Sequence, residues 1–405
     1  MDVTDPANVT APAGTVAART GGGYGVTVVP QGGGTRTLLA FTSAQMRAPV
    51  RVAANQTSSW HTTQAGADLA IISHGGFVGS VAPLVALRQS QKLTVAVVNV
   101  EDVYDEFNFG VSSPYAVKNF LATATAVWKT KPRWVLLVGD ATSDPRDYFG
   151  THQADYVPVE LVGTAQALTA SDDWFGDFDL DGVPELAFRR LPVHAVSDAT
   201  ALVSKIVAYD QAGAATWKNK ALLVAGTNDD ENNFESNVSA VQALLPSTMT
   251  VTQVLQGSDP SPAVNSLAAF NGGQGLVNYI GHGSTEVWQG DLFDSDAASA
   301  VTNGATTPFV VAMTCLNGYF QDVWTFSLAE AVLTAPGGGA VGVWASSGLT
   351  ESAPQAVLNQ AMIKALYGGG SITVGEAAVA AKKAISDPDV RRTWILFGDP
   401  SMKLK

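Results

Sequence analysis

Residues 308–320 read PFVVAMTCLNGYF, and this stretch combines a candidate buried strand with the only cysteine of a 405-residue chain. A continuous apolar run that ends before an Asn-Gly pair is typical of a strand covered on both faces of a parallel sheet. Cys315 therefore lies where a strand ends and a loop begins. A lone cysteine there is either a small core residue or a reactive thiol, and its surroundings must decide between the two.

Apolar runs alternate with helical stretches over most of the chain, which predicts an α/β fold. The clearest runs are 67–73, 93–100, 133–140, 221–226, 275–284 and 394–399. Because the series restarts after the linker 212–220, we expect two side-by-side α/β subdomains with mainly parallel sheets, at 61–215 and 216–405. Residues 1–60 form a β-rich segment with expected strands at 24–29, 36–42 and 49–55.

The overall composition excludes several classes of protein. The chain is 46% hydrophobic and carries a net charge of −13, which argues against nucleic acid or an anionic membrane as its main partner. It contains no apolar run of 18 residues, so no membrane span is expected. Few basic residues, with abundant Thr, Gly and Ala, favour a secreted or cell-surface protein.

A second strand also ends in a reactive residue. The run GLVNYIGHGS at 275–284 places His282 directly after a strand, as 308–315 does for Cys315. If the two strands are parallel neighbours, imidazole and thiol meet at one sheet edge, as thiolate catalysis requires. The N–H groups of Gly283 and Cys315 are then candidates for an oxyanion hole. His74, in ISHGGF at 72–77, fits the same pattern, whereas His194 is expected to be solvated.

The segment DFDLDGVPE at 177–185 is a candidate calcium loop. Asp177, Asp179, Asp181 and Glu185 offer hard oxygen ligands around a tight turn, which suits a structural calcium ion. The loop is an incomplete EF-hand because its twelfth position is Phe188, and an acidic solvated turn is the alternative.

These motifs resemble the gingipain family of cysteine peptidases, which have a caspase-like fold. The resemblance covers about 67–405, and its ordered blocks include GLVNYIGHGSTEVW, TPFVVAMTCLNGYF, GAVGVWASS and TWILFGDPS. It implies that Cys315 is the nucleophile and His282 the base, and that His74 only ends a strand of the first subdomain. Asp140, at the end of another matching block, is expected to cap backbone N–H groups.

The chain departs from the family at three positions. Where the family has a glutamate that orients the histidine, this chain has Asn228, with Asp229 and Asp230 as alternatives. Asn237 replaces the aspartate that arginine-specific members use. The stacking tryptophan is missing from the segment GLTESAP at 348–354. We expect replacement charges from Glu286 or Glu351, and we expect two further side chains, Trp288 and Trp344, to line the substrate cleft.

The sequence therefore predicts a secreted cysteine endopeptidase that cleaves protein or peptide substrates, with a strict preference before the scissile bond and a weak bias towards basic residues. No cofactor is expected in the chemistry. Residues 1–60 are a candidate maturation region, which implies a zymogen and a pro-domain contact. The alternative is a catalytically inactive, peptidase-like binding domain of a surface or secretion-system protein.

Overall fold

The structure is a computed structural model that describes residues 1–46, 48, 57–62 and 65–404. The chain divides into two compact units, Met1–Asn55 and Gln56–Lys405. The strand expected at 49–55 lies outside the described residues.

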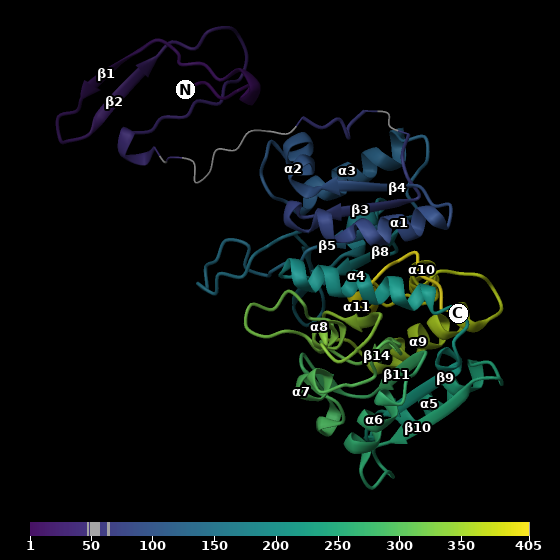
Figure 1. Cartoon of the computed structure of the whole chain (residues 1–405). Helices are drawn as coiled ribbons and strands as arrows, with labels where there is room; N and C mark the ends of the chain where they lie inside the picture. The colour runs from purple at the N-terminus through teal and green to yellow at the C-terminus, as the bar shows by residue number, and fades with distance from the viewer. Residues whose placement is uncertain (47, 49–56, 63–64, 405) are drawn as a thin grey trace. The chain divides into compact units, whose positions relative to one another are not determined.

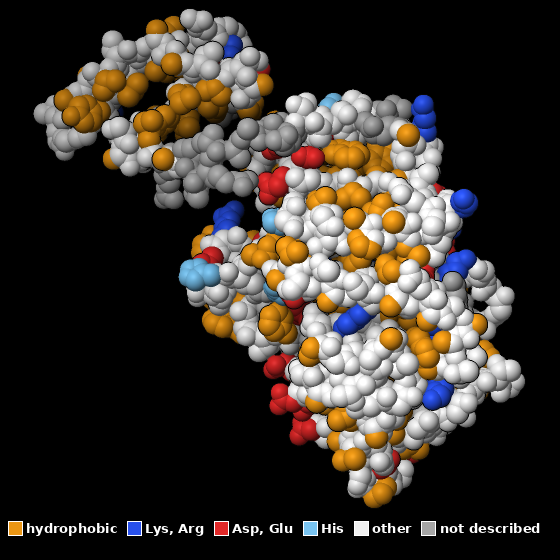
Figure 2. Space-filling view, in the orientation of Figure 1, with side chains coloured by type: hydrophobic (Ala, Val, Ile, Leu, Met, Phe, Trp, Pro, Cys, Tyr) orange, Lys and Arg blue, Asp and Glu red, His pale blue; other side chains and the backbone are white. Residues whose placement is uncertain are grey.

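The N-terminal unit is built around one hairpin. Strand β1 (Gly14–Ala18) pairs antiparallel with β2 (Tyr24–Val28), and two short 3-10 segments flank the pair, η1 (Pro6–Asn8) and η2 (Ser43–Gln45). The strand expected at 36–42 is wrong, because only an isolated bridge from Leu38 to Asp2 forms there. None of the unit's described hydrophobic side chains is buried, and Figure 2 shows many of them around a hollow, a groove of about 450 Å³. Two strands cannot enclose a core by themselves.

The second unit is organised by one ten-stranded sheet, with the strand order β10-β9-β11-β14-β15-β16-β8-β5-β3-β4. Its strands are β3 (Leu69–Ser73), β4 (Val95–Asn99), β5 (Trp134–Val138), β8 (Ala187–Leu191), β9 (Lys220–Ala225), β10 (Thr250–Leu255), β11 (Leu276–Ile280), β14 (Phe309–Met313), β15 (Gly342–Ser346) and β16 (Trp394–Phe397). All neighbours pair parallel except β15 and β16. In Figure 1 the edge strands β4 and β10 lie at opposite ends of this unit.

Eleven α-helices occur among the described residues, most of them as crossovers between strands. They are α1 (Ala82–Ser90), α2 (Val100–Asn108), α3 (Pro114–Val127), α4 (Val196–Gln211), α5 (Phe234–Leu244), α6 (Pro262–Asn271), α7 (Ser295–Ser299), α8 (Leu328–Thr334), α9 (Ser352–Tyr367), α10 (Val374–Lys383) and α11 (Pro388–Thr393). Two short hairpins, β6–β7 (Glu160–Gly163, Leu168–Ser171) and β12–β13 (Gly283–Ser284, Val287–Trp288), and the 3-10 segments η3 (Gly75–Val81), η4 (Asp173–Gly176), η5 (Thr216–Asn219) and η6 (Gln289–Asp291) complete the unit.

Alternating side chains of the strands enter two cores on opposite faces of the sheet. On β5, Leu136 packs into the core that includes α1 and α4, whereas Leu137 packs into the core that includes α2 and α3. This period of two is the reason why the strand sequences are apolar throughout: both faces are covered by helices.

The two halves of the second unit share this sheet. The C-terminal strand β16 pairs antiparallel with β15 and, through Phe397 and Arg190, parallel with β8 of the first half. The expected boundary at 215/216 falls between α4 and β9, where the chain crosses from one half of the sheet to the other. The prediction of an α/β fold with a mainly parallel sheet is confirmed.

Among the described helices, none combines the length and the apolar character that a bilayer crossing needs. On the face that Figure 2 shows, lysine and arginine side chains are scattered singly rather than gathered into a patch. A polyanion gains most of its affinity from clustered cations, so this face offers no such footprint.

Candidate active site

His282 and Cys315 lie at equivalent positions beyond two neighbouring strands. Strands β11 and β14 run parallel, with Ile280 opposite Met313, and each reactive residue follows two positions later. Parallel strands lie about 4.8 Å apart. The shared register therefore brings both residues to the same carboxyl edge of the sheet, as the sequence predicted.

The backbone around His282 is held in one conformation. The Tyr279 hydroxyl and the Gln289 N–H both donate hydrogen bonds to the His282 carbonyl oxygen. A Cβ at Gly283 would lie 2.6 Å from Thr314 Oγ1 and 2.8 Å from the Val287 carbonyl oxygen, so only glycine fits there. The fixed loop leaves the imidazole about half exposed at the sheet edge.

Asp229, and not Asn228, orients the imidazole. His282 Nε2 lies 2.7 Å from Asp229 Oδ2, whereas the Asn228 side chain accepts the backbone N–H of Glu235. The prediction for Asn228 is wrong by one residue, since the turn after β9 faces His282 one position later than expected. A carboxylate only accepts hydrogen bonds, so the neutral imidazole carries its proton on Nε2 and leaves Nδ1 without a proton.

The Asp229 carboxylate is fixed by its own turn. Its Oδ1 accepts the backbone N–H groups of Glu231 at 2.9 Å and Asn232 at 2.8 Å, while Oδ2 faces His282. The bond with the His282 side chain, followed by the bonds from Asn232 and Glu231, holds the pKa of Asp229 well below its usual value. Asp229 is therefore ionised at neutral pH.

The loop after Cys315 is tied to the hairpin after His282. The buried Asn317 donates from Nδ2 to the Ser284 carbonyl oxygen at 2.6 Å, and its Oδ1 accepts Trp288 Nε1 at 2.8 Å. Gly318 is buried as well, since a Cβ there would lie 2.7 Å from the Ala345 carbonyl oxygen. Asn317 thus ties the loop after Cys315 to the hairpin after His282.

The Cys315 thiol has Thr350 as its hydrogen-bond partner. Sγ lies 3.5 Å from both the N–H and the carbonyl oxygen of Thr350, and in the described part of the chain no hydrogen bond joins it to the imidazole. Burial, with a smaller contribution from Glu351, raises the pKa of the Cys315 thiol. The structure therefore holds the thiol protonated; catalytic hydrogen bonds are often long or unformed before substrate binds.

Two of the four expected cleft residues are buried instead. Trp288 stacks on Tyr279 with ring centroids 4.3 Å apart, and Trp344 packs in β15 against Trp394. The prediction that these two tryptophans line a substrate cleft is wrong, because both side chains fill the core beneath the catalytic loops. Glu286 and Glu351 are exposed, as a residue that binds substrate must be.

The acidic loop brings three of its four expected ligands together. Oxygen atoms of Asp177, Asp179 and Glu185 lie within 4.8 Å of one another. Asp181 lies outside this group, and its Oδ1 accepts the N–H of Val183 at 2.7 Å. Including Asp181 among the side-chain ligands is therefore not supported by the loop geometry.

His194 does not have the solvated environment expected from the sequence. Its side chain is 27% exposed, and Nε2 lies 3.3 Å from Asp140 and 3.5 Å from Glu330. Sequence patterns missed this cluster because its members lie on separate elements; His194 and Glu330 are 136 positions apart.

Known proteins share both the sequence pattern and the fold. A model described as peptidase family C25 matches residues 62–405. Gingipain R2 of Porphyromonas gingivalis is 27% identical over 297 residues, which cover 67% of this chain but only 38% of that protein.

Two solved structures support the same relationship. The Arg-specific cysteine proteinase gingipain R has a TM-score of 0.70 at 22% identity, over 84% of this chain and 78% of that one. A complex of Porphyromonas gingivalis RgpB pro- and mature domains has a TM-score of 0.69 at 21% identity, over 82% and 78%. The fold of this unit is therefore caspase-like, as expected, and the chain belongs to peptidase family C25, the family of the gingipain cysteine peptidases.

Proposed function

We propose that this chain is a cysteine endopeptidase in which Cys315 is the nucleophile and His282 the general base. The observation that carries the proposal is the shared register of β11 and β14, which brings thiol and imidazole to one sheet edge, with Asp229 on the far nitrogen of the ring. Membership of family C25 supports the same reaction class.

Catalysis begins when the thiol leaves Thr350 and gives its proton to Nδ1 of His282. The thiolate attacks the carbonyl carbon of the scissile bond, and the oxyanion is held by the N–H groups of Gly283 and Cys315. The Cys315 N–H suits this role because it has no acceptor among the described residues. His282 then protonates the leaving amine, and the same base activates the water that hydrolyses the thioester.

Hydrolysis of a peptide library tests the proposal directly. We expect the purified chain to cleave a subset of peptides, and we expect a Cys315→Ala variant of equal thermal stability to cleave none. Equal cleavage by both proteins would assign the activity to a contaminant and would contradict the proposal.

For specificity, we propose a weak preference for a basic residue before the scissile bond. The Glu351 carboxylate precedes α9 without a side-chain capping bond and lies close enough to Cys315 to raise its pKa. Glu286, which lines a separate cavity of about 340 Å³, is the weaker candidate. Gingipain R is Arg-specific; here Asn237 stands where that recognition is expected to require an aspartate.

We further propose a structural calcium ion at Asp177, Asp179 and Glu185. The three carboxylates converge on one point, and calcium prefers such oxygen ligands. Lys118 already donates to the Asp177 carbonyl oxygen at 2.7 Å, so part of the local negative charge is compensated without an ion. Calcium should raise the melting temperature of protein from which a chelator has removed metal ions, and Asp179→Asn should abolish that rise.

Secretion and activation from a zymogen complete the proposal. The family match begins at residue 62, just beyond the N-terminal unit, which supports residues 1–60 as a separate segment that is removed on activation. The active enzyme then lacks this segment. If the enzyme removes the segment itself, the Cys315→Ala variant retains it. Removal of the segment at the same rate in both proteins would show that another peptidase performs the cut.

The rival function is a peptidase-like binding domain without activity. Two observations favour it: the thiol bonds to Thr350 rather than to the imidazole, and its pKa is raised. The library experiment separates the two, since a binding domain leaves every peptide intact.

A further inference from the structure

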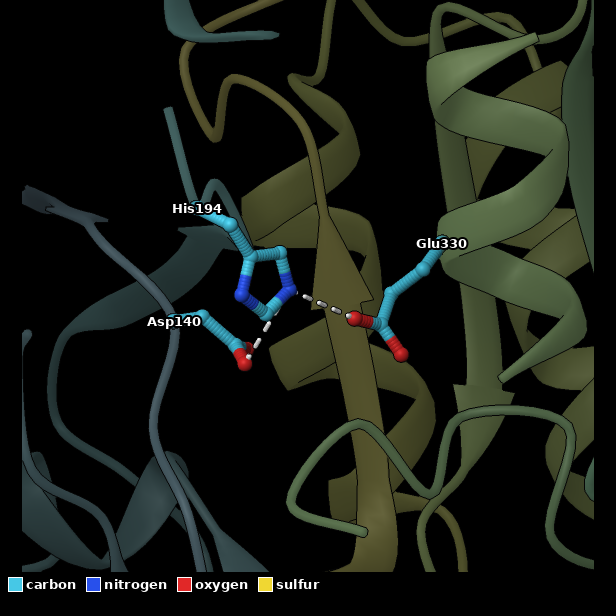
Figure 3. A group of neighbouring side chains, drawn as sticks. All are labelled: Asp140, His194 and Glu330. Carbon is cyan, nitrogen blue, oxygen red and sulfur yellow. Dashed lines mark hydrogen bonds and ion pairs between the residues drawn. The ribbon is translucent and has the colours of Figure 1, made fainter. Parts of the chain in front are cut away.

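A second histidine–carboxylate cluster lies away from the catalytic pair. Asp140 follows β5, His194 follows β8 and Glu330 lies in α8, so three separate elements contribute one side chain each. In Figure 3 the Asp140 carboxylate lies below the imidazole and the Glu330 carboxylate to its right, and both contact Nε2. The cluster therefore joins the first half of the sheet to a helix of the second.

The spacing of the three side chains fits one small ion. His194 Nε2 lies 3.3 Å from Asp140 Oδ2 and 3.5 Å from Glu330 Oε1, and the three ligand atoms lie within 4.8 Å of one another. Around a tetrahedral zinc ion with bonds of about 2.0–2.1 Å, two ligand atoms are separated by roughly 3.3–3.4 Å. The distance from His194 Nε2 to each carboxylate oxygen thus matches the separation of two ligand atoms around a tetrahedral zinc ion.

The cluster has an acceptor that the protein itself does not satisfy. Asp140 is fully buried, and its Oδ1 has no hydrogen-bond partner in the described structure. Buried polar atoms are almost always paired, so an orphaned carboxylate oxygen indicates a missing cation or water. This observation is independent of the ligand spacing.

Arg190 compensates Asp140 only in part, through its charge, because its hydrogen bonds go to other groups. Arg190 binds Asp172 through Nε at 2.9 Å and through NH2 at 2.7 Å, and its NH1 donates to the carbonyl oxygens of Gly139 and Val157. Besides this charge, Asp140 Oδ2 accepts the Gln153 amide at 3.3 Å, and in the described residues the group that Asp140 and Glu330 share is the His194 imidazole. A divalent ion balances the charge of the two carboxylates, whereas a buried uncompensated carboxylate is costly.

Two of the three ligands, Glu330 and His194, are each held by a second contact. Glu330 uses Oε2 to accept the N–H and hydroxyl of Ser327, which caps α8, and this leaves Oε1 for the ion. Tyr156 donates its hydroxyl to the His194 carbonyl oxygen at 2.9 Å. Metal ligands are typically oriented by partners of this kind.

An entry path leads to the cluster. A cavity of about 340 Å³ is lined by His194 and Glu330, together with Glu286 and Phe326. The site is therefore buried enough to hold an ion and open enough to exchange it.

We infer that Asp140, His194 and Glu330 form a binding site for a divalent transition-metal ion of the zinc class. One imidazole nitrogen and two carboxylate oxygens suit such an ion better than calcium, which prefers oxygen alone. The ion holds the start of α8, where Leu328 and Ala329 donate backbone N–H groups to Thr285 and Asn317 of the two catalytic loops. Its role is structural support for those loops.

Zinc titration of protein from which a chelator has removed metal ions tests the inference. The background is Cys315→Ala, which removes the catalytic thiol as a competing zinc ligand, and calcium is added in excess to fill oxygen-only sites. We expect one zinc ion to bind per chain by calorimetry, cobalt to give the absorption of a tetrahedral site, and zinc to raise the melting temperature.

Variants in this background identify the ligands. His194→Ala and Glu330→Gln should each weaken zinc binding at least tenfold, and Gln at position 330 keeps the α8 cap because a capping box accepts glutamine. The matched control is His152→Ala, since His152 pairs with a single carboxylate, Asp147, on the surface. That variant should leave the affinity unchanged within about twofold.

Two results would overturn the inference. One is the absence of zinc binding at 0.1 mM zinc, on the order of a weak site. The other is zinc binding of equal affinity in the His194→Ala and Glu330→Gln proteins.

Discussion

The molecule uses histidine and carboxylate side chains in two opposite surroundings. His282 faces one carboxylate, Asp229, at an open sheet edge, and the bond with the His282 side chain, followed by the bonds from Asn232 and Glu231, holds the pKa of that carboxylate low. His194 faces two carboxylates inside the protein, where burial, together with repulsion from Glu330, raises the pKa of Asp140. The proposals therefore assign proton transfer to the exposed pair and ion binding to the buried cluster.

Replacing the two histidines should separate these roles most sharply. His282→Ala removes the base, and we expect kcat/KM to fall roughly 10⁴-fold. His194→Ala should change turnover far less, because that side chain does not touch the reacting atoms. Steady-state hydrolysis of one good peptide measures both. Equal losses in the two variants would remove the distinction.

Replacing the orienting carboxylate should have the next largest effect. Asp229→Asn leaves an amide that cannot stabilise the imidazolium, so we expect kcat to fall about 10²- to 10³-fold. The neighbouring Asn228→Ala is the matched control, since that side chain only accepts the Glu235 N–H. A larger loss for Asn228→Ala would restore the original assignment of the third catalytic residue.

The cluster of Asp140, His194 and Glu330 should change the free energy of unfolding with pH in the opposite direction to Asp229. Burial raises the pKa of Glu330 above its usual value of 4.5. In the metal-free protein the unfolded state therefore releases this proton at a lower pH than the folded state does. Stability falls as pH rises from 4.5 to the raised pKa. For Asp229, whose pKa is lowered, stability is instead lost as pH falls below the usual value.

Denaturant titration of the metal-free protein measures this difference. Glu330→Gln should raise the free energy of unfolding at pH 8 by on the order of 1 kcal/mol and leave it unchanged at pH 4. With zinc bound the sign should reverse, because the variant loses a ligand. A destabilised Glu330→Gln protein at pH 8 without metal would indicate that the charge is already compensated.

The smallest expected effect concerns substrate preference. Glu351→Gln should reduce the ratio of kcat/KM for basic over neutral leading residues by about threefold to tenfold, since an exposed charge interacts weakly through solvent. Glu286→Gln is the comparison, because its carboxylate lies on the cavity beside His194. If only Glu286→Gln alters the ratio, the substrate pocket is the cavity that Glu286 and His194 line.

Strand positions, and the position of His282 and Cys315 at one sheet edge, could be predicted from the sequence because their causes are local. An apolar run that ends at His282 or Cys315 is visible within ten residues, and the parallel fold then brings both ends to one edge. The third residue was misplaced because Asn228 and Asp229 are adjacent, and only the path of the turn decides which one faces the imidazole.

The remaining errors arose from contacts between distant segments. Trp288 was expected in a cleft, yet Asn317 from another loop accepts its indole N–H in the core. His194 was expected in solvent because Asp140 and Glu330, its partners in space, lie on other elements. The run at 36–42 did not form a strand, since it makes one isolated bridge and does not join the β1–β2 pair.

Covalent labelling of Cys315 tests the central claim most directly. A set of peptide chloromethylketones with basic, neutral and acidic leading residues is incubated with the protein, and the modified residue is located by mass spectrometry. The account predicts rapid alkylation of Cys315 by at least one reagent and labelling slowed at least a hundredfold, on the order of a lost general base, in His282→Ala. Labelling of Cys315 at equal rates in both proteins, or none with any reagent, would contradict it.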